Sequence, residues 1–408
     1  MKTYAVGGCV RDRLLGRAVA DRDWVVVGAT PEQMIAAGFR PVGRDFPVFL
    51  HPATHEEYAL ARTERKTAPG YHGFVFHAAP DVTLQEDLAR RDLTINAMAL
   101  ADDGTLVDPF GGRADLEAKL LRHVGPAFAE DPVRILRVAR FAARFADFRV
   151  ADETMRLMRA MADAGEVEAL VAERVWQELA RGLMEPRPSR MFDTLHECGA
   201  LARLLPELDR AGSAPRPGDA AGVVDTGPLL MRALDAAASM NAPLPSRWAV
   251  LLHEPGAGAA PGGEPQRADH GARGVALARA VNERLRVPGD CRDASILAVR
   301  EQRQIERALE LDAEALVQLI ERSDALRRPR LLAQVLDACE ALARARGTLA
   351  ADRYPQRERM LAALQAARGV DAGAIAARAG PEGARIAQAV HEARVAAVAT
   401  QRAGSEEG

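Results

Sequence analysis

The stretch "GGCVRDRLLGRAVADRDWVVVG" (Gly7–Gly28) decides the fold of this 408-residue chain. It closes on Trp24–Val27, an apolar run that predicts a buried β-strand. Asp21 and Asp23 stand at the start of this strand, and alternate residues of a strand point to the same face. Two neighbouring carboxylates repel each other unless a cation lies between them. The stretch therefore predicts an α/β domain with a cation site at one end of a strand.

The residues around this aspartate pair point to phosphate chemistry. Carboxylates on one strand face suit a pair of Mg²⁺ ions that polarise a phosphate and activate a hydroxyl. Gly7 and Gly8 follow a predicted strand and open a short helix, so their N–H groups can approach a triphosphate, and Arg11 adds positive charge. A plain surface turn is the alternative interpretation, and an isolated Asp-x-Asp pair also occurs in glycosyltransferases. The combination favours metal-assisted phosphoryl chemistry.

The composition is that of a soluble globular protein with about two to four domains. The net charge is −3, and 48% of the residues are hydrophobic. The four cysteines form no Cys-x-x-Cys pair, which argues against a zinc site or a disulfide framework. The N-terminus reaches Gly7-Gly8 too early for a signal peptide, and no apolar run approaches the roughly 18 residues of a membrane span. We expect a cytoplasmic protein with no membrane segment and no obligate protein partner.

Residues 1 to about 125 have the pattern of a mixed α/β domain. We expect strands at Thr3–Val6, Trp24–Val27, Val48–Leu50, Glu57–Ala61, Phe74–His77 and Leu106–Val107. One helix is predicted through "TLQEDLARRDLTINAMAL" (Thr83–Leu100), with a capping box formed by Thr83 and Glu86. From Pro132 to about Leu205 the pattern changes to successive helices. Arg210–Gly227 has the composition of a linker, and Pro255–Gly274 that of a flexible loop.

The segment "EDPVRILRVARFAAR" (Glu130–Arg144) suggests recognition of a base. Asp131 lies one helical turn before Arg134, so a simple ion pair is one interpretation. Cytosine and adenine both present an amino donor beside a ring-nitrogen acceptor, which a carboxylate and a guanidinium complement. Guanine and uracil present the reverse pattern. The pair thus predicts a template for C and A, with Arg137 and Arg140 left to hold phosphates.

Taken together, these motifs resemble those of the class II tRNA nucleotidyltransferases, the family of bacterial CCA-adding enzymes. The resemblance is carried by "GGCVRD", "DRDW", "RRDLTINA", "DPFGG", "EDPVRILRVARFAAR" and "ERVWQEL", which occur in the family's order over about residues 1–208. It implies addition of C-C-A to tRNA 3′ ends from CTP and ATP without a nucleic-acid template. It also implies an α/β nucleotidyltransferase head, a small mixed sheet with helices, followed by an all-α neck, body and tail.

The resemblance also implies roles for individual residues. Asp21 and Asp23 would bind Mg²⁺, and Asp131 with Arg134 would read the base. Apart from the resemblance, Glu57 on a neighbouring predicted strand is the candidate for a third carboxylate of the metal site. The incoming nucleotide would be bound by Gly8, Arg11, Arg91, Arg137 and Arg140. A bacterial poly(A) polymerase shares the motifs of the head and is the nearest alternative. A tRNA-binding protein without activity is another, although the intact aspartates and arginines argue against it.

Longer bacterial members of this family append a helical His-Asp phosphohydrolase domain, and this chain resembles one with a degenerate copy. Leu229 stands where those members have a histidine, and "HEPGAG" (His253–Gly258) replaces their "HDLGKG". We therefore expect no phosphohydrolase activity. The expected division is 1–125 catalytic head, 126–208 neck and body for base selection and tRNA binding, 209–227 linker, 228–345 degenerate domain, and 346–408 helical tail.

Overall fold

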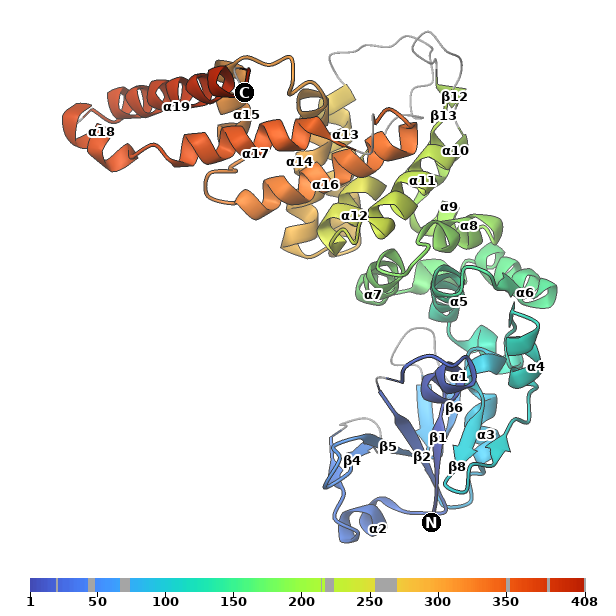
Figure 1. The fold of residues 1–408 in the computed structure, drawn as a ribbon. Coiled ribbons are helices and arrows are strands. Elements are labelled where there is room, and N and C mark those ends of the chain that lie inside the picture. Colours follow the sequence, from blue (N-terminus) through green and yellow to red (C-terminus); the bar gives the residue numbers. More distant parts are fainter. Residues whose placement is uncertain are drawn as a thin grey trace. The chain divides into compact units, whose positions relative to one another are not determined.

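The computed structural model describes residues 1–19, 21–42, 48–66, 74–213, 215–216, 224–253, 270–349, 353–379 and 382–406. The chain divides into two compact units (Figure 1). The first contains Met1–Gly182 and Arg190–Leu204, and the second contains Leu183–Ser189 and Leu205–Gly408. None of the helices in these ranges is long and apolar enough to cross a membrane.

The first unit is built on a seven-stranded mixed sheet with the order β3-β4-β5-β2-β1-β8-β9. Its strands are β1 Lys2–Val6, β2 Asp23–Val27, β3 Arg40–Pro41, β4 Val48–Leu50, β5 Glu57–Leu60, β8 Ala99–Ala101 and β9 Leu106–Val107. Strand β2 pairs antiparallel with β1 and parallel with β5. Val25 and Val26 of β2 are buried on opposite faces, each in its own apolar cluster. The mixed sheet of the predicted head is confirmed.

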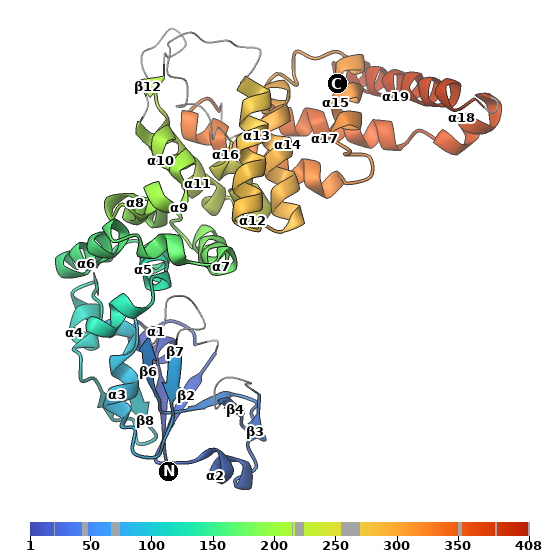
Figure 2. The ribbon, with the colours of Figure 1, turned by 180° about the vertical axis from the view of Figure 1, so that it is seen from behind.

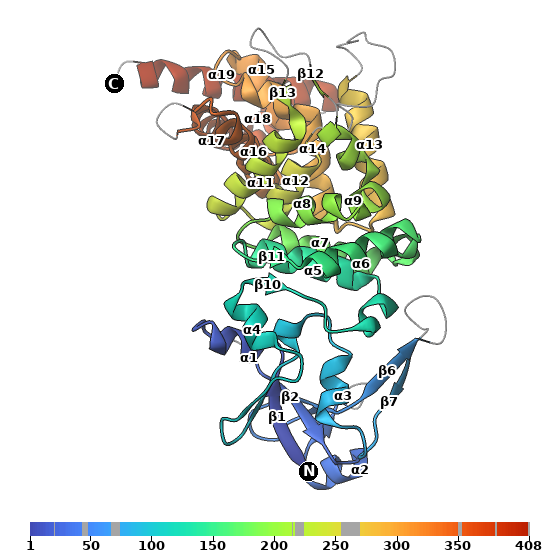
Figure 3. The ribbon, with the colours of Figure 1, turned by 90° about the vertical axis from the view of Figure 1, so that its right-hand side faces the viewer.

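Two short strands form a separate hairpin beside this sheet. Strands β6 (Thr63–Lys66) and β7 (Phe74–His77) pair antiparallel and run side by side (Figure 3). With them, all six strands expected from the sequence are observed. Strands β10 (Leu120–Leu121) and β11 (Arg149–Val150) form a further parallel pair that the sequence did not predict.

The prediction of a single helix over Thr83–Leu100 is wrong. Helix α3 covers only Leu84–Ala89, although its capping box of Thr83 and Glu86 is present. Leu93 then adopts an extended conformation (φ −121°, ψ 146°) and bridges to His123, before a 3₁₀ turn and strand β8. Leu93, Ile95 and Met98 are fully buried. Their apolar pattern reflects burial by the surrounding elements rather than one face of a helix.

The "DPFGG" turn fixes the position of this non-helical segment. Asp108 accepts hydrogen bonds from the backbone N–H groups of Gly112 (2.7 Å) and Arg113 (2.9 Å) at the start of α4 (Gly112–Glu117). A side chain at Gly112 would collide with the backbone of Thr94. The glycine therefore allows α4 to lie directly against the segment that carries "RRDLTINA".

Helices complete the first unit and confirm the change of pattern at Pro132, which caps α5. Besides α3 and α4, its α-helices are α1 Gly8–Leu14, α2 Pro31–Ala36, α5 Val133–Arg144, α6 Asp152–Asp163, α7 Ala172–Leu183, α8 Ser189–Glu197 and α9 Ala200–Leu204. Helix α5 is the most deeply enclosed, since Ile135, Leu136, Val138 and Ala139 are fully buried. The packing of these residues therefore holds the backbone that carries the arginines of α5 in a fixed position.

The second unit is helical wherever it is described, apart from one short pair of strands, β12 (Pro215–Arg216) and β13 (Val224–Asp225). Its helices are α10 Pro206–Ser213, α11 Thr226–Ser239, α12 Leu244–Leu251, α13 His270–Arg284, α14 Gly289–Glu306, α15 Ala313–Arg322, α16 Pro329–Arg346, α17 Pro355–Arg368, α18 Ala372–Ala379 and α19 Gly383–Glu406. Helix α16 packs against α11, α12 and α14 (Figure 2).

Two expectations for the second unit need correction. The expected linker Arg210–Gly227 is helical up to Ser213, and α11 already begins at Thr226. The loop expected over Pro255–Gly274 ends earlier than predicted, because α13 begins at His270. Residues 254–269 of that loop lie outside the described ranges.

Candidate active site

The Gly-Gly turn connects β1 to α1 and requires glycine at its first position. Gly7 has φ +75° and ψ −129°, and its N–H donates to the Met98 carbonyl (3.2 Å). A Cβ added to Gly7 would lie 2.9 Å from Nη1 of Arg91, and one added to Gly8 would lie 3.4 Å from Nη2 of Arg11. The turn therefore lies in direct contact with two of the arginines predicted to bind the nucleotide.

The two aspartates are exposed, but only Asp23 belongs to strand β2. Asp21 precedes the strand, so the alternation of side chains expected from the sequence does not fix its direction. Asp23 pairs with Val6 of β1, the residue before the Gly-Gly turn, and with Glu57 of β5. The strand register thus brings Asp23 next to the turn and to the candidate third carboxylate.

These three acidic residues offer only carboxylate oxygens, the donors that Mg²⁺ prefers. The side chains of Asp21, Asp23 and Glu57 form no hydrogen bond or ion pair with the residues that the structure describes. Within those same ranges, no three His, Cys, Asp or Glu side chains are grouped closely enough to hold a metal ion. The donor chemistry fits Mg²⁺, while the grouping of the side chains does not form a complete ligand shell.

Arg11 is the centre of a buried polar network. Its side chain is only 3% exposed and donates from Nη1 to Oδ1 of Asn96 and from Nε to Oδ1 of Asp12 (2.9 Å). The guanidinium carbon lies 5.2 Å and 5.1 Å from the ring centroids of Phe141 and Phe145. Hydrogen bonds and aromatic faces together hold this cation in one orientation.

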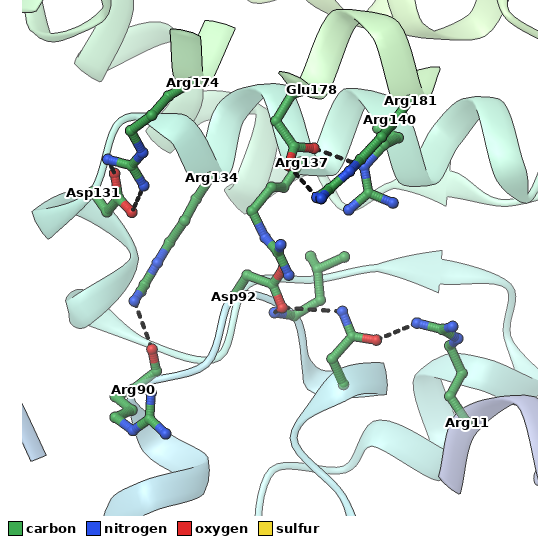
Figure 4. Close-up of polar contacts among 12 residues, drawn as sticks. Arg11, Arg90, Asp92, Asp131, Arg134, Arg137, Arg140, Arg174, Glu178 and Arg181 are labelled. Carbon is green, nitrogen blue, oxygen red and sulfur yellow. Dashed lines mark hydrogen bonds and ion pairs between the residues drawn. The ribbon is translucent and has the colours of Figure 1, made fainter. Parts of the chain in front are cut away.

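Asp92 links that network to helix α5 (Figure 4). Oδ1 of Asp92 accepts from Nδ2 of Asn96 (3.0 Å), and Oδ2 accepts from Nε of Arg137 (2.7 Å). Burial by itself would raise the pKa of Asp92, but the charge of Arg137 and the hydrogen bonds outweigh it and lower the pKa to about 2. Asp92 is therefore anionic at neutral pH and orients Arg137.

Arg140 is oriented in the same way by a carboxylate from α7. Its Nε donates to Oε2 of Glu178 (2.6 Å), and its guanidinium carbon lies 4.6 Å from the centroid of Phe141. Arg11 and Arg137 also lie within 6 Å of the Phe141 ring, at 5.2 Å and 5.9 Å. Three of the predicted nucleotide-binding arginines thus surround one aromatic side chain.

Asp131 and Arg134 lie at the start of α5 with their side chains bound to other partners. Both oxygens of Asp131 accept from Arg174, at 3.0 Å and 2.7 Å. Arg134 donates from Nη1 to the carbonyl of Ala127 (2.7 Å) and from Nη2 to the carbonyl of Arg90 (2.6 Å). Figure 4 shows both on the same side of the network as Arg90. Their role in reading a base stays a prediction.

Sequence reasoning did not assign roles to four residues that hold the site together. Asp92, Asn96, Arg174 and Glu178 all bond to one of the predicted site residues. All four lie inside two of the motifs that carry the family resemblance: Asp92 and Asn96 in "RRDLTINA", and Arg174 and Glu178 in "ERVWQEL". The motifs themselves were thus the available signal.

The class of protein follows from the head and its site. Residues 3–122 match the family described as "Poly A polymerase head domain", and residues 147–211 match "Probable RNA and SrmB- binding site of polymerase A". The mixed sheet, the Gly-Gly turn and the arginine cluster define a nucleotidyltransferase head followed by helices.

Comparison with whole proteins narrows this class. The chain is 61% identical to the "Multifunctional CCA protein" of Burkholderia multivorans and 62% identical to that of Burkholderia mallei (strain SAVP1), in each case over 406 residues and 98% of both chains. The chain belongs to the multifunctional CCA protein family, as its motifs predicted.

Solved structures share the fold at much lower identity. A structure described as "CCA-adding enzyme apo form II" has a TM-score of 0.66 at 21% identity and covers 99% of this chain and 92% of its own. The Bacillus stearothermophilus CCA-adding enzyme in complex with CTP has a TM-score of 0.67 at 23% identity, with coverage of 97% and 88%. The order of a nucleotidyltransferase head followed by helices is therefore common to all of them.

Proposed function

We propose that this protein builds and repairs the 3′-terminal CCA of tRNA, using CTP and ATP and no nucleic-acid template. The observation that carries the proposal is the identity of about three residues in five, over nearly the whole chain, to multifunctional CCA proteins. CCA-adding enzymes of the same fold have been solved with CTP, with ATP and with a tRNA. The contacts around Arg11, Arg137 and Arg140 support a site for an anionic nucleotide.

Asp21 and Asp23, with Glu57 as the third carboxylate, hold Mg²⁺ in this proposal. When bound, the metal supplies charge that polarises the α-phosphate and activates the tRNA 3′-hydroxyl. The register of Asp23 between Val6 and Glu57 supports this assignment, because it joins the carboxylates to the Gly-Gly turn. Their exposure and lack of partners leave the oxygens available to a cation.

The triphosphate is held by the Gly7-Gly8 turn and by Arg11, Arg91, Arg137 and Arg140. Guanidinium groups bind phosphate oxygens through paired hydrogen bonds, and the carboxylates behind them fix their direction. Arg137 has a side-chain exposure of 35%, so a ligand can reach it while Asp92 holds the other side. Asp92, Asn96 and Glu178 act as positioning residues.

Base selection is assigned to Asp131 and Arg134. A carboxylate accepts from the exocyclic amino group of C or A, and a guanidinium donates to the neighbouring ring nitrogen. Asp131 is held by Arg174 and Arg134 by two carbonyls, so both must change partners when a base binds.

The decisive test is incorporation of nucleotides onto tRNA lacking its 3′ end. We expect two C residues and one A, with CTP and ATP both required. Asp21→Ala and Asp23→Ala are expected to abolish transfer while tRNA binding persists, and near wild-type transfer by either variant would remove the metal assignment. A poly(A) polymerase would add repeated A from ATP alone, and an inactive binding protein would bind tRNA without extending it.

Residues 228–345 carry no phosphohydrolase activity in this proposal. Leu229 is buried where relatives of the His-Asp type have a histidine. Nη2 of Arg346 lies 3.4 Å from Nε2 of His253, and the same guanidinium pairs with Glu306. A fixed cation beside this imidazole opposes metal binding there. Glu254, in the place of the expected aspartate, lies outside the described residues.

The activity assay for this domain uses 2′,3′-cyclic phosphate substrates with Ni²⁺, Mn²⁺ or Mg²⁺. We expect no turnover above that of buffer. Turnover that disappears in His253→Ala would overturn the assignment. We also assign the protein to the cytoplasm, and we propose residues 125, 208, 227 and 345 as the domain boundaries.

A further inference from the structure

A second candidate binding site lies in the helical unit, in a cavity of about 840 Å³. It is bounded by the turn Met184–Arg187, the end of α11, the start of α12 and the end of α16. Four arginines line it, namely Arg187, Arg232, Arg247 and Arg344, against two acidic residues, Glu185 and Asp235. All of these belong to the second unit, and neither Leu229 nor His253 is among the lining residues.

Two of the four arginines have a carboxylate partner. Asp235 accepts from Nε of Arg187 (3.0 Å) and from the hydroxyl of Ser189 (2.8 Å). Arg344 pairs with Glu340 at 2.9 Å. The charge of Asp235 is therefore already satisfied by Arg187 and does not neutralise the remaining cations.

Arg247 is buried without such a partner. It is 4% exposed, and its Nε and Nη1 donate to the backbone carbonyls of Ala242 (2.8 Å) and Leu183 (2.7 Å). Its Nη2 makes no hydrogen bond with any described residue, and it is not among the enclosed polar atoms that lack a partner. Nη1 also donates to the carbonyl of Glu185 (3.3 Å), so Nη2 is the nitrogen of this cavity-lining residue left without a partner among the described residues.

Arg232 provides a second cation without a carboxylate partner among the residues described. Within the described ranges its one hydrogen bond is long, from Nε to the carbonyl of Ala345 (3.4 Å), and the side chain is exposed. A buried guanidinium loses hydration that backbone carbonyls replace only in part, since they carry no full charge. Arg247 is such a group, and the exposed Arg232 adds a second cation to the same cavity, so the two together create a site that an anion would complete.

We propose that this cavity binds a phosphate group. Phosphate oxygens accept paired hydrogen bonds from guanidinium groups, and Arg232 with the free Nη2 of Arg247 offers donors from two directions. The cavity is larger than a single phosphate needs, so the phosphate can remain attached to a larger molecule. The two sources with this chemistry are a phosphodiester of the bound RNA and a small phosphate such as orthophosphate. The RNA source rests on the proposed function.

The test compares Arg232→Gln and Arg344→Gln with Arg330→Gln as a matched control. Arg330 is exposed on the same helix as Arg344, about four turns away, and does not line the cavity. Arg247 is left unchanged because it also holds the Leu183 backbone. Binding of tRNA is titrated at several salt concentrations, and protection by orthophosphate is followed as a rise in melting temperature.

For an RNA phosphate, Arg232→Gln should weaken tRNA binding about tenfold and reduce the slope of log K against log salt by about one. For a small phosphate, tRNA binding stays unchanged and the rise in melting temperature with orthophosphate disappears. Either result supports the site if Arg330→Gln behaves as wild type. Unchanged tRNA binding together with unchanged orthophosphate protection in both cavity variants overturns it.

Failure of this proposal can be told apart from failure of the proposed function. A wild-type protein that neither binds nor extends tRNA would contradict the proposed function, while the orthophosphate measurement would still test the cavity. At saturating tRNA, Arg232→Gln should incorporate CTP at the wild-type rate, since the residue belongs to the other unit from the nucleotide site.

Discussion

Nε and Nη2 of Arg137 both lie 2.7 Å from the same carboxylate oxygen of Asp92. This ion pair joins helix α5 to the turn that follows α3. Asp92 is 5% exposed, whereas the Arg137 side chain is 35% exposed. The carboxylate therefore fixes the arginine from the protein side and leaves its other side open. The charge of Asp92 raises the pKa of Arg137, so the cation persists at every pH used for assays.

Replacing Asp92 tests this arrangement. Asp92→Asn keeps the shape but removes the charge, and we expect the free energy of unfolding at pH 7 to fall by about 2 kcal/mol. The pKa of Asp92 is lowered to about 2, so its contribution is present above about pH 4 and disappears as the pH falls towards 2. The difference between wild type and variant in urea unfolding should therefore shrink from pH 7 to pH 3.

Asp81→Asn is the control for the stability measurement, because Asp81 is exposed and its replacement should leave stability unchanged.

Asp92→Asn should also raise KM for CTP and ATP together, because Arg137 loses its fixed direction. Wild-type stability and wild-type KM values in Asp92→Asn would show that Asp92 does not position Arg137.

The Gly-Gly turn allows a comparison between two glycines with almost the same φ angle. Gly7 has φ +75° and Gly28 has φ +76°, but an added Cβ would meet Nη1 of Arg91 at 2.9 Å only in the first case. Alanine costs about 1 kcal/mol or more at either position because of the positive φ. We expect Gly7→Ala alone to raise KM for the nucleotide, by about tenfold, since it displaces Arg91.

Steady-state kinetics and thermal unfolding of both alanine variants check this prediction. Equal losses of activity in Gly7→Ala and Gly28→Ala would assign the effect to strain, and Arg91 would then have no role in the turn. The comparison is informative because, apart from the two neighbouring residues, no described residue has an atom within 4 Å of a Cβ added at Gly28.

The sequence predicted most of the sheet and the locations of the motifs, because both depend on local patterns. An apolar run was enough to predict the strand at Trp24–Val27, and the residues Thr83 and Glu86 were enough to predict the cap of α3. The prediction of a helix failed for the segment after α3. Leu93 and Ile95 are buried by elements distant in the sequence, and this burial explains their apolar spacing better than a helix does. Arg174 lies inside a quoted motif, but its pairing with Asp131 could not be predicted, because the packing of α7 near α5 brings the two side chains together.

Base selection can be tested at Arg134. If this guanidinium donates to the ring nitrogen of C and A, Arg134→Ala should lower kcat/KM for CTP and ATP by about 100-fold and lower the values for UTP and GTP less. Arg113→Ala serves as control, because Arg113 is an exposed arginine paired with Glu117. Single-nucleotide incorporation with each of the four triphosphates provides the measurement. Equal losses for all four would leave Arg134 as a structural residue.

His391 links the last helix to α15 and should make the tail sensitive to pH. Its Nδ1 lies 2.8 Å from Oε2 of Glu321 and its Nε2 lies 2.8 Å from Oε1 of Glu314, while Arg394 also pairs with Glu321. Both ring nitrogens can donate to carboxylates only in the imidazolium form. The hydrogen bonds to Glu314 and then Glu321 raise the pKa of His391 above its ordinary value.

A raised pKa in the folded state stabilises the protein fully below about pH 6.5 and ceases to do so as the pH rises through the folded value. We therefore expect amide exchange in α19, corrected for the intrinsic rate, to accelerate between pH 6 and pH 9 in the wild type. In His391→Gln the exchange should be fast already at pH 6 and change little with pH. The control His77→Gln alters an exposed histidine of the first unit and should retain the wild-type profile. A pH dependence that survives in His391→Gln would show that another group joins α19 to α15.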